Sequence, residues 1–364
     1  MTTILLAGGG TGGHLMPALA IAAEVGKLQP TWRFVFAGAQ RGIEAEVLPQ
    51  RGVPHRLLPL EPFYRRQWWR NARWLTLAPK LIGAVNSLLD DELPAAVIGT
   101  GGYVSGPVVW QATHRGIPTG ILELDVQPGL ATRFRAGRVT EIWTATPEAI
   151  AALPSRARGR ASVMGAPIVV PDPSRRASAL QKFGLDSARP VLVVTGGSQG
   201  SLAINRLIAD WLKAGEAADV QVIWATGPRT FPEFAPLHDP PRVIVTPFLD
   251  PMADAWSVAD LCVARAGMMT IAELCAWGIP SVLIPLPSAA ADHQSHNARA
   301  LAASGAAVVC PEAGLTPTTL GAALGELLHD TPQRQRMAAA AAARGRPDAA
   351  ASIARRVVEL ARRV

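Results

Sequence analysis

The sequence has few cysteines, few lysines and no long uninterrupted apolar run. Its three cysteines, Cys262, Cys275 and Cys310, form no CxxC pair, so the sequence indicates neither a disulfide framework nor a zinc site, and a reducing, cytoplasmic compartment fits. Proline, glycine or charge interrupts every apolar stretch before it reaches about 18 residues, and the N-terminus has no basic segment of a signal peptide. We therefore expect neither a membrane span nor export. Because only four of the 35 basic residues are lysine, the net charge of +7 reflects a preference for arginine and is weak evidence for nucleic acid.

Short apolar runs alternate with helical patterns in two successive series. The 364 residues, 49% of them hydrophobic, suffice for two domains that each bury a core. In each series the alternation predicts a parallel sheet with helical crossovers, and helices are expected at 15–27 and 104–115. A proline-containing linker at 165–176 separates the series, and an arginine-rich helix follows Pro347. The expected strands are TILLAG, RFVFAG, AAVIGTG, TGILE and EIWTAT in the first series, and PVLVVTGGSQG, DVQVIWATG, RVIVTPF, LCVAR, PSVLIPL and AAVVC in the second.

A glycine-rich turn followed by a histidine marks the end of the first strand. The stretch AGGGTGGHLMPALAIAAEV places five glycines within residues 8–13 and then His14 at the start of a helix, where backbone N–H groups and the helix dipole favour an anion. Residues 8, 10 and 13 satisfy GxGxxG. However, the second strand ends in AGAQRG without the acid that a dinucleotide site needs for the ribose, and Glu44 already lies in the next helix. Tight strand-to-helix packing explains only two of the glycines, so we interpret the loop as ligand-facing.

Strand ends of the second series carry further glycine-rich or polar segments. The turn GGSQG adds the side chains of Ser198 and Gln199 to a bare backbone, and residues 267–270 begin a helix directly after a strand. One turn later, Glu273 either chelates the hydroxyls of a ribose or lies on a solvated helix face. One glycine-rich strand end in each of two domains, both facing one cleft, indicates that one domain binds a nucleotide-activated donor and the other binds an acceptor. The loop within 285–301 gathers amides and acids where open α/β sheets bind ligands: Asp292, His293, Gln294 and Asn297.

Five segments carry a specific combination of motifs: GGGTGGH (8–14), GGYVSGP (101–107), GGSQG (196–200), RAGMMTIAE (265–273) and DHQSHNA (292–298). In this order, along nearly the whole chain, they resemble the motifs of the MurG family, the UDP-N-acetylglucosamine transferases that convert lipid I to lipid II in peptidoglycan synthesis. The resemblance implies an α/β fold of the GT-B class, with two Rossmann-like doubly wound domains facing an interdomain cleft. The acceptor domain is then expected at 1–164, with helix 348–364 packing back on it, and the UDP-sugar domain at 165–347.

The resemblance also implies an inverting hexosyl transfer from UDP-GlcNAc to lipid I, without a metal or another cofactor. Such a transfer needs a base near the 4-hydroxyl of the muramoyl sugar, for which His14 is the candidate, and stabilisation of the departing UDP. Because the chain has no DxD motif, the helix N-terminus at 267–270 would stabilise the diphosphate. Positions that match the acceptor side are Thr11, Gly12, Gly13, Tyr103, Glu123 and Asp125, and those that match the donor side are Ser198, Gln199, Leu249, Met268, Met269, Thr270, Glu273 and Gln294.

Two segments depart from the family's pattern. The family's HEQN tetrad appears as LELD at 122–125, which keeps only the acid, and its GNPVR appears as GAPIV, with Val169 in place of an arginine for the donor diphosphate. Loss of such a charge-assisted contact weakens nucleotide binding by about 1.5–3 kcal/mol unless another cation replaces it. Alternatives therefore stay open: a GT-B transferase with a different lipid acceptor, a UDP-sugar epimerase on the same fold, or a non-catalytic protein that binds UDP-sugar or a lipid carrier.

An aromatic and basic segment at 61–85 bears on the partners. The stretch EPFYRRQWWRNARWLTLAPKLIGAV holds three of the ten tryptophans, with arginines between them. Such rings and cations suit an interface with anionic lipid, and without a nucleic-acid-binding motif we rank nucleic acid well below lipid. The matching region of the family is a membrane-associating surface. We therefore expect a peripheral protein on the cytoplasmic face of the plasma membrane, with other wall-synthesis proteins as further partners.

Overall fold

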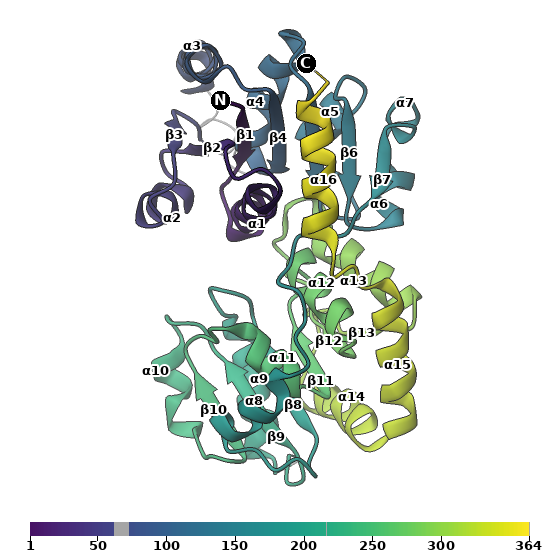
Figure 1. The fold of residues 1–364 in the computed structure, drawn as a ribbon. Helices are drawn as coiled ribbons and strands as arrows, with labels where there is room; N and C mark the ends of the chain where they lie inside the picture. The colour runs from purple at the N-terminus through teal and green to yellow at the C-terminus, as the bar shows by residue number, and fades with distance from the viewer. Residues whose placement is uncertain (62–72, 216, 364) are drawn as a thin grey trace. The chain divides into compact units, whose positions relative to one another are not determined.

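The computed structural model describes residues 1–61, 73–215 and 217–363 of the 364-residue chain. The chain forms two compact units: unit 1 comprises Met1–Ile168 with Asp348–Val364, and unit 2 comprises Val169–Pro347. The linker expected at 165–176 contains the junction between them. Each unit consists of a parallel sheet with helices packed against it (Figure 1).

The described sheet of unit 1 has seven strands in the order β3-β2-β1-β4-β5-β6-β7. The order reverses at β1, which pairs with both β2 and β4, and ligands of open α/β sheets bind beside such a switch point. Strands β3 and β7 are not among the predicted apolar runs, because they are short, only partly buried and lie at the two edges. The strands are β1 (Thr3–Gly8), β2 (Arg33–Ala39), β3 (His55–Leu58), β4 (Ala96–Gly101), β5 (Thr119–Glu123), β6 (Glu141–Thr144) and β7 (Ala161–Val163).

The helices of unit 1 include the three that the sequence predicted for it, the third being α16 within the expected segment 348–364. Helix α1 begins three positions before the predicted segment 15–27, at Gly12, and α4 covers the predicted segment 104–115 up to His114. Helix α1 packs against the C-terminal helix α16, and α3 packs against α4. The described helices are α1 (Gly12–Leu28), α2 (Glu44–Gln50), α3 (Trp74–Glu92), α4 (Gly102–His114), α5 (Leu130–Arg135), α6 (Pro147–Ala152), α7 (Ser155–Arg158) and α16 (Ala349–Ala361).

Two arginines bind the C-terminal segment to the sheet of unit 1. Arg356 in α16 donates to both carboxylate oxygens of Glu141 in β6, from Nε at 3.0 Å and from Nη2 at 2.7 Å. Arg363 donates to the same carboxylate at 2.8 Å. Glu141 is buried and also accepts the indole N–H of Trp143 at 3.1 Å. A buried carboxylate is thus compensated by charge-assisted hydrogen bonds that hold α16 in place.

The described sheet of unit 2 repeats the same strand order, β10-β9-β8-β11-β12-β13, with the reversal at β8. All six strands expected in the second series are present. They read as continuous runs of valine, leucine and isoleucine because helices cover both faces of a parallel sheet. The strands are β8 (Val191–Thr195), β9 (Gln221–Ala225), β10 (Val243–Thr246), β11 (Leu261–Ala264), β12 (Ser281–Leu283) and β13 (Ala307–Val309).

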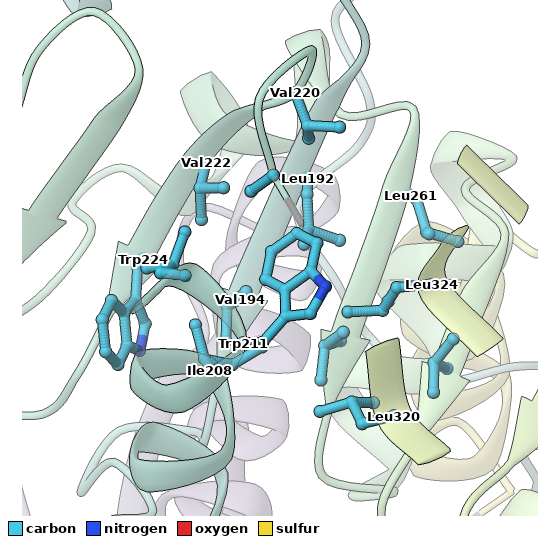
Figure 2. Packing of buried hydrophobic residues seen from close by; sticks show 14 of the residues in the cluster. Leu192, Val194, Ile208, Trp211, Val220, Val222, Trp224, Leu261, Leu320 and Leu324 are labelled. Atoms are coloured by element: carbon cyan, nitrogen blue, oxygen red, sulfur yellow. The ribbon is translucent and has the colours of Figure 1, made fainter. Parts of the chain in front are cut away.

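Tryptophans fill much of the core of unit 2. Figure 2 shows Trp211 between Leu192 and Leu320, with Trp224 farther along the same core. Both rings are almost fully buried, and the Trp224 indole donates to the Asn205 amide at 3.0 Å. The described helices of unit 2 are α8 (Arg175–Phe183), α9 (Leu202–Lys213), α10 (Phe231–Phe234), α11 (Met252–Val258), α12 (Met268–Trp277), α13 (His293–Ala303), α14 (Pro317–His329) and α15 (Thr331–Arg344), with 3₁₀ turns at Ala235–Leu237 and Ala290–Asp292.

Within the part of the chain that the structure describes, no helix has the length and apolar character needed to cross a membrane. Of the aromatic and basic segment 61–85, residues 62–72 lie outside the described residues. Helix α3 carries the remainder of that segment from Trp74 onward.

Candidate active site

Two glycine-rich loops of unit 1 meet at the switch point of its sheet. The glycine-rich loop of residues 8–13 runs from the last residue of β1 into the first turn of α1, while Gly101 ends β4 and Gly102 begins α4. Strands β1 and β4 are neighbours, so both loops lie at the same edge of the sheet. The Thr100 hydroxyl, at the end of β4, donates to the carbonyl of His14 in the first turn of α1 at 2.8 Å, which joins the two segments directly.

The glycines let the rings of His14 and Tyr103 lie directly on the backbone of this loop pair. A Cβ added at Gly101 would lie 2.6 Å from His14 Nδ1, and one added at Gly10 would lie 2.6 Å from Tyr103 Cε1. Both glycines also have positive φ angles, 102° and 89°, which other residues rarely adopt. Space and conformation therefore both require glycine here, and the structure brings the predicted base and the predicted acceptor-side tyrosine into one cluster.

The loop predicted to hold the acceptor diphosphate is the N-terminus of α1. Thr11 is the N-cap residue, its side chain is exposed, and that side chain does not cap the helix. Gly12 and Gly13 form the first turn, and a Cβ added at Gly12 would meet nothing within 4 Å. With open space beside it, this turn can offer its backbone N–H groups and the positive end of the helix dipole to an anion.

Glu123 and Asp125 lie at the next strand end, that of β5, beyond β4. The Glu123 carboxylate is buried and accepts the backbone N–H of Asp125 at 3.2 Å and that of Gly129 at 3.0 Å. Burial raises the pKa of Glu123 to about 7, the Asp125 charge adds to the rise, and the hydrogen bonds to Glu123 oppose it. These contacts direct the carboxylate toward its own loop, so Glu123 organises residues 124–129.

Five of the predicted donor residues lie at the switch point of the second sheet. Ser198 and Gln199 are exposed in the loop after β8, and residues 268–270 begin α12 directly after β11, the neighbour of β8. The N-cap of α12 is Gly267, which provides no side-chain cap for the first turn. The structure therefore brings together an exposed pair of polar side chains and an uncapped helix N-terminus, which suits a diphosphate.

Glu273 lies one turn farther along α12 and is half-buried. The indole N–H of Trp256 in α11 donates to its Oε2 at 3.0 Å. Burial raises the pKa of the Glu273 carboxyl above its ordinary value, and the bond from Trp256 opposes this rise. Glu273 therefore does not lie on a fully solvated helix face. A carboxylate fixed through one oxygen presents the other as an acceptor, which suits the hydroxyls of a ribose.

Gln294 and Leu249 complete the predicted donor set. The Gln294 side-chain oxygen accepts the backbone N–H of Leu286 at 3.0 Å, which fixes the loop after β12 and orients the amide nitrogen as a donor. Leu249 follows β10, and its side chain is 7% exposed, so any contact with a base would involve its backbone. Asn297, one turn after Gln294, is buried and donates to the carbonyl of Ala266 at 3.3 Å, so it supports the loop before α12.

Arg265 is a residue of this site that was not predicted from the sequence. Its side chain is buried and donates to the carbonyl oxygens of Ile284 at 3.1 Å and Pro285 at 3.2 Å, and to the Ser201 hydroxyl at 2.7 Å. It also pairs with Glu312 at 2.5 Å. Arg265 thus ties together the loops after β8, β11 and β12. An arginine directly after a buried strand is the signal that indicates such a role, because buried charges need partners.

Comparisons with known proteins cover both units. The model of the glycosyltransferase family 28 N-terminal domain matches residues 4–144, and that of the family 28 C-terminal domain matches residues 191–353. A curated protein of Salinibacter ruber, named UDP-N-acetylglucosamine--N-acetylmuramyl-(pentapeptide) pyrophosphoryl-undecaprenol N-acetylglucosamine transferase, is 40% identical, over 99% of this chain and 97% of its own. This chain belongs to the MurG family of glycosyltransferases.

Other members of the MurG family show the same likeness. The protein of the same name from Carboxydothermus hydrogenoformans is 37% identical, over 91% of this chain and 90% of its own. The crystal structure of Acinetobacter baumannii MurG is 25% identical, covers both chains completely and superimposes with a TM-score of 0.77. The predicted GT-B fold class, with its N- and C-terminal family 28 domains, is therefore confirmed.

Proposed function

We propose that this protein transfers N-acetylglucosamine from UDP-GlcNAc, with inversion, to the 4-hydroxyl of the muramoyl sugar of lipid I, and so forms lipid II for peptidoglycan. The observation that carries the proposal is the similarity to curated transferases of this name along nearly the whole chain. The residues at the switch points of the two sheets give a physical reason for this activity. In each unit a helix N-terminus that can bind an anion, that of α1 or of α12, lies beside polar side chains.

In this proposal unit 1 binds the acceptor and activates its hydroxyl. His14 accepts the proton of the 4-hydroxyl as that oxygen attacks C1 of the donor sugar, and Tyr103 borders the reacting centre. Residues 11–13 bind the acceptor diphosphate through the first turn of α1. Glu123 and Asp125 act on the acceptor side through the loop after β5.

Unit 2 binds the donor and stabilises the leaving group. As the bond between C1 and the phosphate oxygen breaks, the electron pair and negative charge pass to UDP, and the N-terminus of α12 at residues 268–270 stabilises that charge. Glu273 holds the ribose, Gln294 the sugar hydroxyls, Ser198 and Gln199 the rest of the donor, and the Leu249 backbone the uracil. We propose that no metal or other cofactor takes part, so transfer should persist in excess chelator.

We also propose that unit 1 rests on the cytoplasmic face of the plasma membrane, where a polyprenyl-linked acceptor is reached. Helices α3, α4 and α5 line an apolar groove of about 280 Å³. Phe134 at its edge is 72% exposed, and the Arg135 guanidinium lies 4.7 Å from the ring of Trp110. Exposed rings beside a cation suit an interface with anionic lipid. Lining residues include Trp74, Ile82, Pro107, Trp110 and Phe134.

Two experiments test these proposals. Purified protein, UDP-GlcNAc and a lipid I analogue should yield a disaccharide-linked lipid by mass spectrometry, and an unchanged acceptor would contradict the transfer. For the membrane, Phe134→Ser should weaken sedimentation with anionic vesicles by roughly tenfold, since one exposed ring no longer enters the lipid. The control is Phe248→Ser, which removes a 52% exposed ring from unit 2. Equal binding of the two variants to the vesicles would exclude the groove as the surface that contacts the membrane.

A further inference from the structure

The carboxylate of Glu44 lies fully buried beneath the glycine-rich loop of unit 1. Glu44 is the first residue of α2, and its exposed fraction is 0%. Both oxygens accept the backbone N–H of Gly10, Oε1 at 3.1 Å and Oε2 at 3.0 Å. Oε1 also accepts the N–H of Ala39, at the end of β2, at 2.9 Å. One carboxylate therefore joins the loop after β1 to the end of the neighbouring strand, through charge-assisted hydrogen bonds.

Three glycines form the slot in which this side chain lies. A Cβ added at Gly9 would lie 2.1 Å from Glu44 Oε1, one at Gly38 2.4 Å from Cγ, and one at Gly42 2.3 Å from the carboxylate. None of the three has a positive φ, so backbone conformation does not demand glycine at these positions. The space for Glu44 demands it, which accounts for part of the glycine content of this region.

The loop that Glu44 holds is the one against which the predicted acceptor-side residues pack. The ring of Tyr103 lies on Gly10, and a Cβ added at Gly102 would lie 2.1 Å from the carbonyl oxygen of Gly9. Residue 11 follows as the N-cap of α1, and His14 lies in the first turn of that helix. A shift of Gly10 would therefore move both His14 and Tyr103, the two rings that pack on this loop pair.

We propose that Glu44 is a positioning residue for the acceptor half of the reaction. It fixes residues 9–11 through the Gly10 N–H, and so sets the position of the Thr11 side chain and of the His14 imidazole. The carboxylate is a resident anion of the glycine-rich loop, so the acceptor diphosphate binds the N–H groups of the first turn of α1 and not that of Gly10. The kinetic part of this inference rests on the proposed transferase function.

The first test is Glu44→Gln, with Glu46→Gln as the matched control, because Glu46 is an exposed acid of the same helix. The amide keeps the shape of the side chain but turns an NH₂ group toward one N–H donor. Hydrogen exchange of peptides covering residues 8–14 should quicken by about tenfold in Glu44→Gln and not in the control. Unchanged exchange would overturn the proposal, whether or not the protein is a transferase.

The kinetic test separates positioning from general stability. Glu44→Gln should lower kcat/KM for the lipid I analogue by roughly 10- to 100-fold, because small displacements of catalytic groups have effects of this size. The dissociation constant of UDP-GlcNAc should change by less than about twofold, since the donor residues lie in unit 2. A parallel loss of donor binding, or an unchanged kcat/KM, would contradict the positioning role. Absence of transfer by the unmutated protein would refute the proposed function and leave the exchange test standing.

A double-mutant cycle tests the slot itself. Gly9→Ala introduces a methyl group where the Glu44 carboxylate lies, and should by itself lower kcat/KM for the acceptor. In the Glu44→Ala background the same methyl group has space, so Gly9→Ala should then change kcat/KM by less than about twofold. Additive losses from the two substitutions would show that Gly9 is needed for another reason.

Discussion

The buried carboxyl of Glu123 makes the stability of unit 1 depend on pH. Burial raises its pKa from 4.5 to about 7. Below pH 4.5 both the folded and the unfolded states are protonated, and the group has no net effect. Between pH 4.5 and 7 the unfolded chain loses its proton while the folded chain keeps it, so stability falls as pH rises. Above pH 7 both states are ionised, and the loss is constant at about 3 kcal/mol, from 1.36 kcal/mol per pH unit.

The variant Glu123→Gln removes this titration and keeps one acceptor for the N–H groups of Asp125 and Gly129. Its free energy of unfolding relative to the unmutated protein should therefore rise by about 2.5 kcal/mol between pH 5 and pH 8.5. Denaturant-dependent hydrogen exchange of peptides from β4 and β5 measures this, after correction for intrinsic rates at each pH. Peptides of β8 in unit 2 serve as the internal reference, and the exposed Glu46→Gln as the control variant.

If the difference in free energy of unfolding between Glu123→Gln and the unmutated protein stayed constant over this pH range, this result would refute the reasoning. It would mean that the folded protein ionises Glu123 as readily as the unfolded chain does. The hydrogen bonds to Glu123 from the Thr132 side chain and from the backbone N–H groups of Gly129 and Asp125 would then fully offset the effect of burial.

Three other substitutions test separate contacts. Glu273→Ala should weaken UDP binding by about 1.5–3 kcal/mol in calorimetry, because a fixed carboxylate acceptor is lost, and unchanged affinity would remove Glu273 from the donor site. Arg356→Ala should lower the free energy of unfolding of unit 1 by only about 1 kcal/mol, because Glu141 keeps other donors and the arginine is partly exposed. Faster amide hydrogen exchange in α16 would confirm this loss, and unchanged exchange would contradict it. Gly200→Ala should destabilise unit 2 by about 2–4 kcal/mol in denaturant titrations, because φ is +73° and the Cβ would lie 2.0 Å from the Thr226 carbonyl oxygen; a neutral effect would contradict this geometry.

Strands and site loops could be predicted where the residues that determine them are neighbours in the sequence. Buried parallel strands are continuous apolar runs, and the glycine-rich turns after β1 and β8 follow them directly in the sequence. The helix N-terminus at Gly12 follows from the turn after β1, and that at Met268 follows from the short glycine-containing turn after β11. Once the strand order is known, the loops after β1 and β4 must be neighbours, which explains why His14 and Tyr103 form one cluster.

The residues that support these loops could not be predicted, because their contacts join distant parts of the chain. Glu44 and Gly10 are separated by 34 positions, and Arg265 and Ser201 by 64. In the sequence, Glu44 shows only that the acid of a dinucleotide site is missing from the end of the second strand. Its structural role is evident from the backbone N–H groups of Gly10 and Ala39 around it. The bond from Trp256 that holds the Glu273 carboxylate likewise depends on the packing of α11 against α12.

The most direct test of the central claim is the release of UDP from UDP-GlcNAc by purified protein, with and without a lipid I analogue, compared with His14→Ala. We predict release that depends on the acceptor and falls by about 100-fold or more in the variant, since the proposed base is removed. Donor binding without turnover, or turnover that His14→Ala leaves unchanged, would contradict the account.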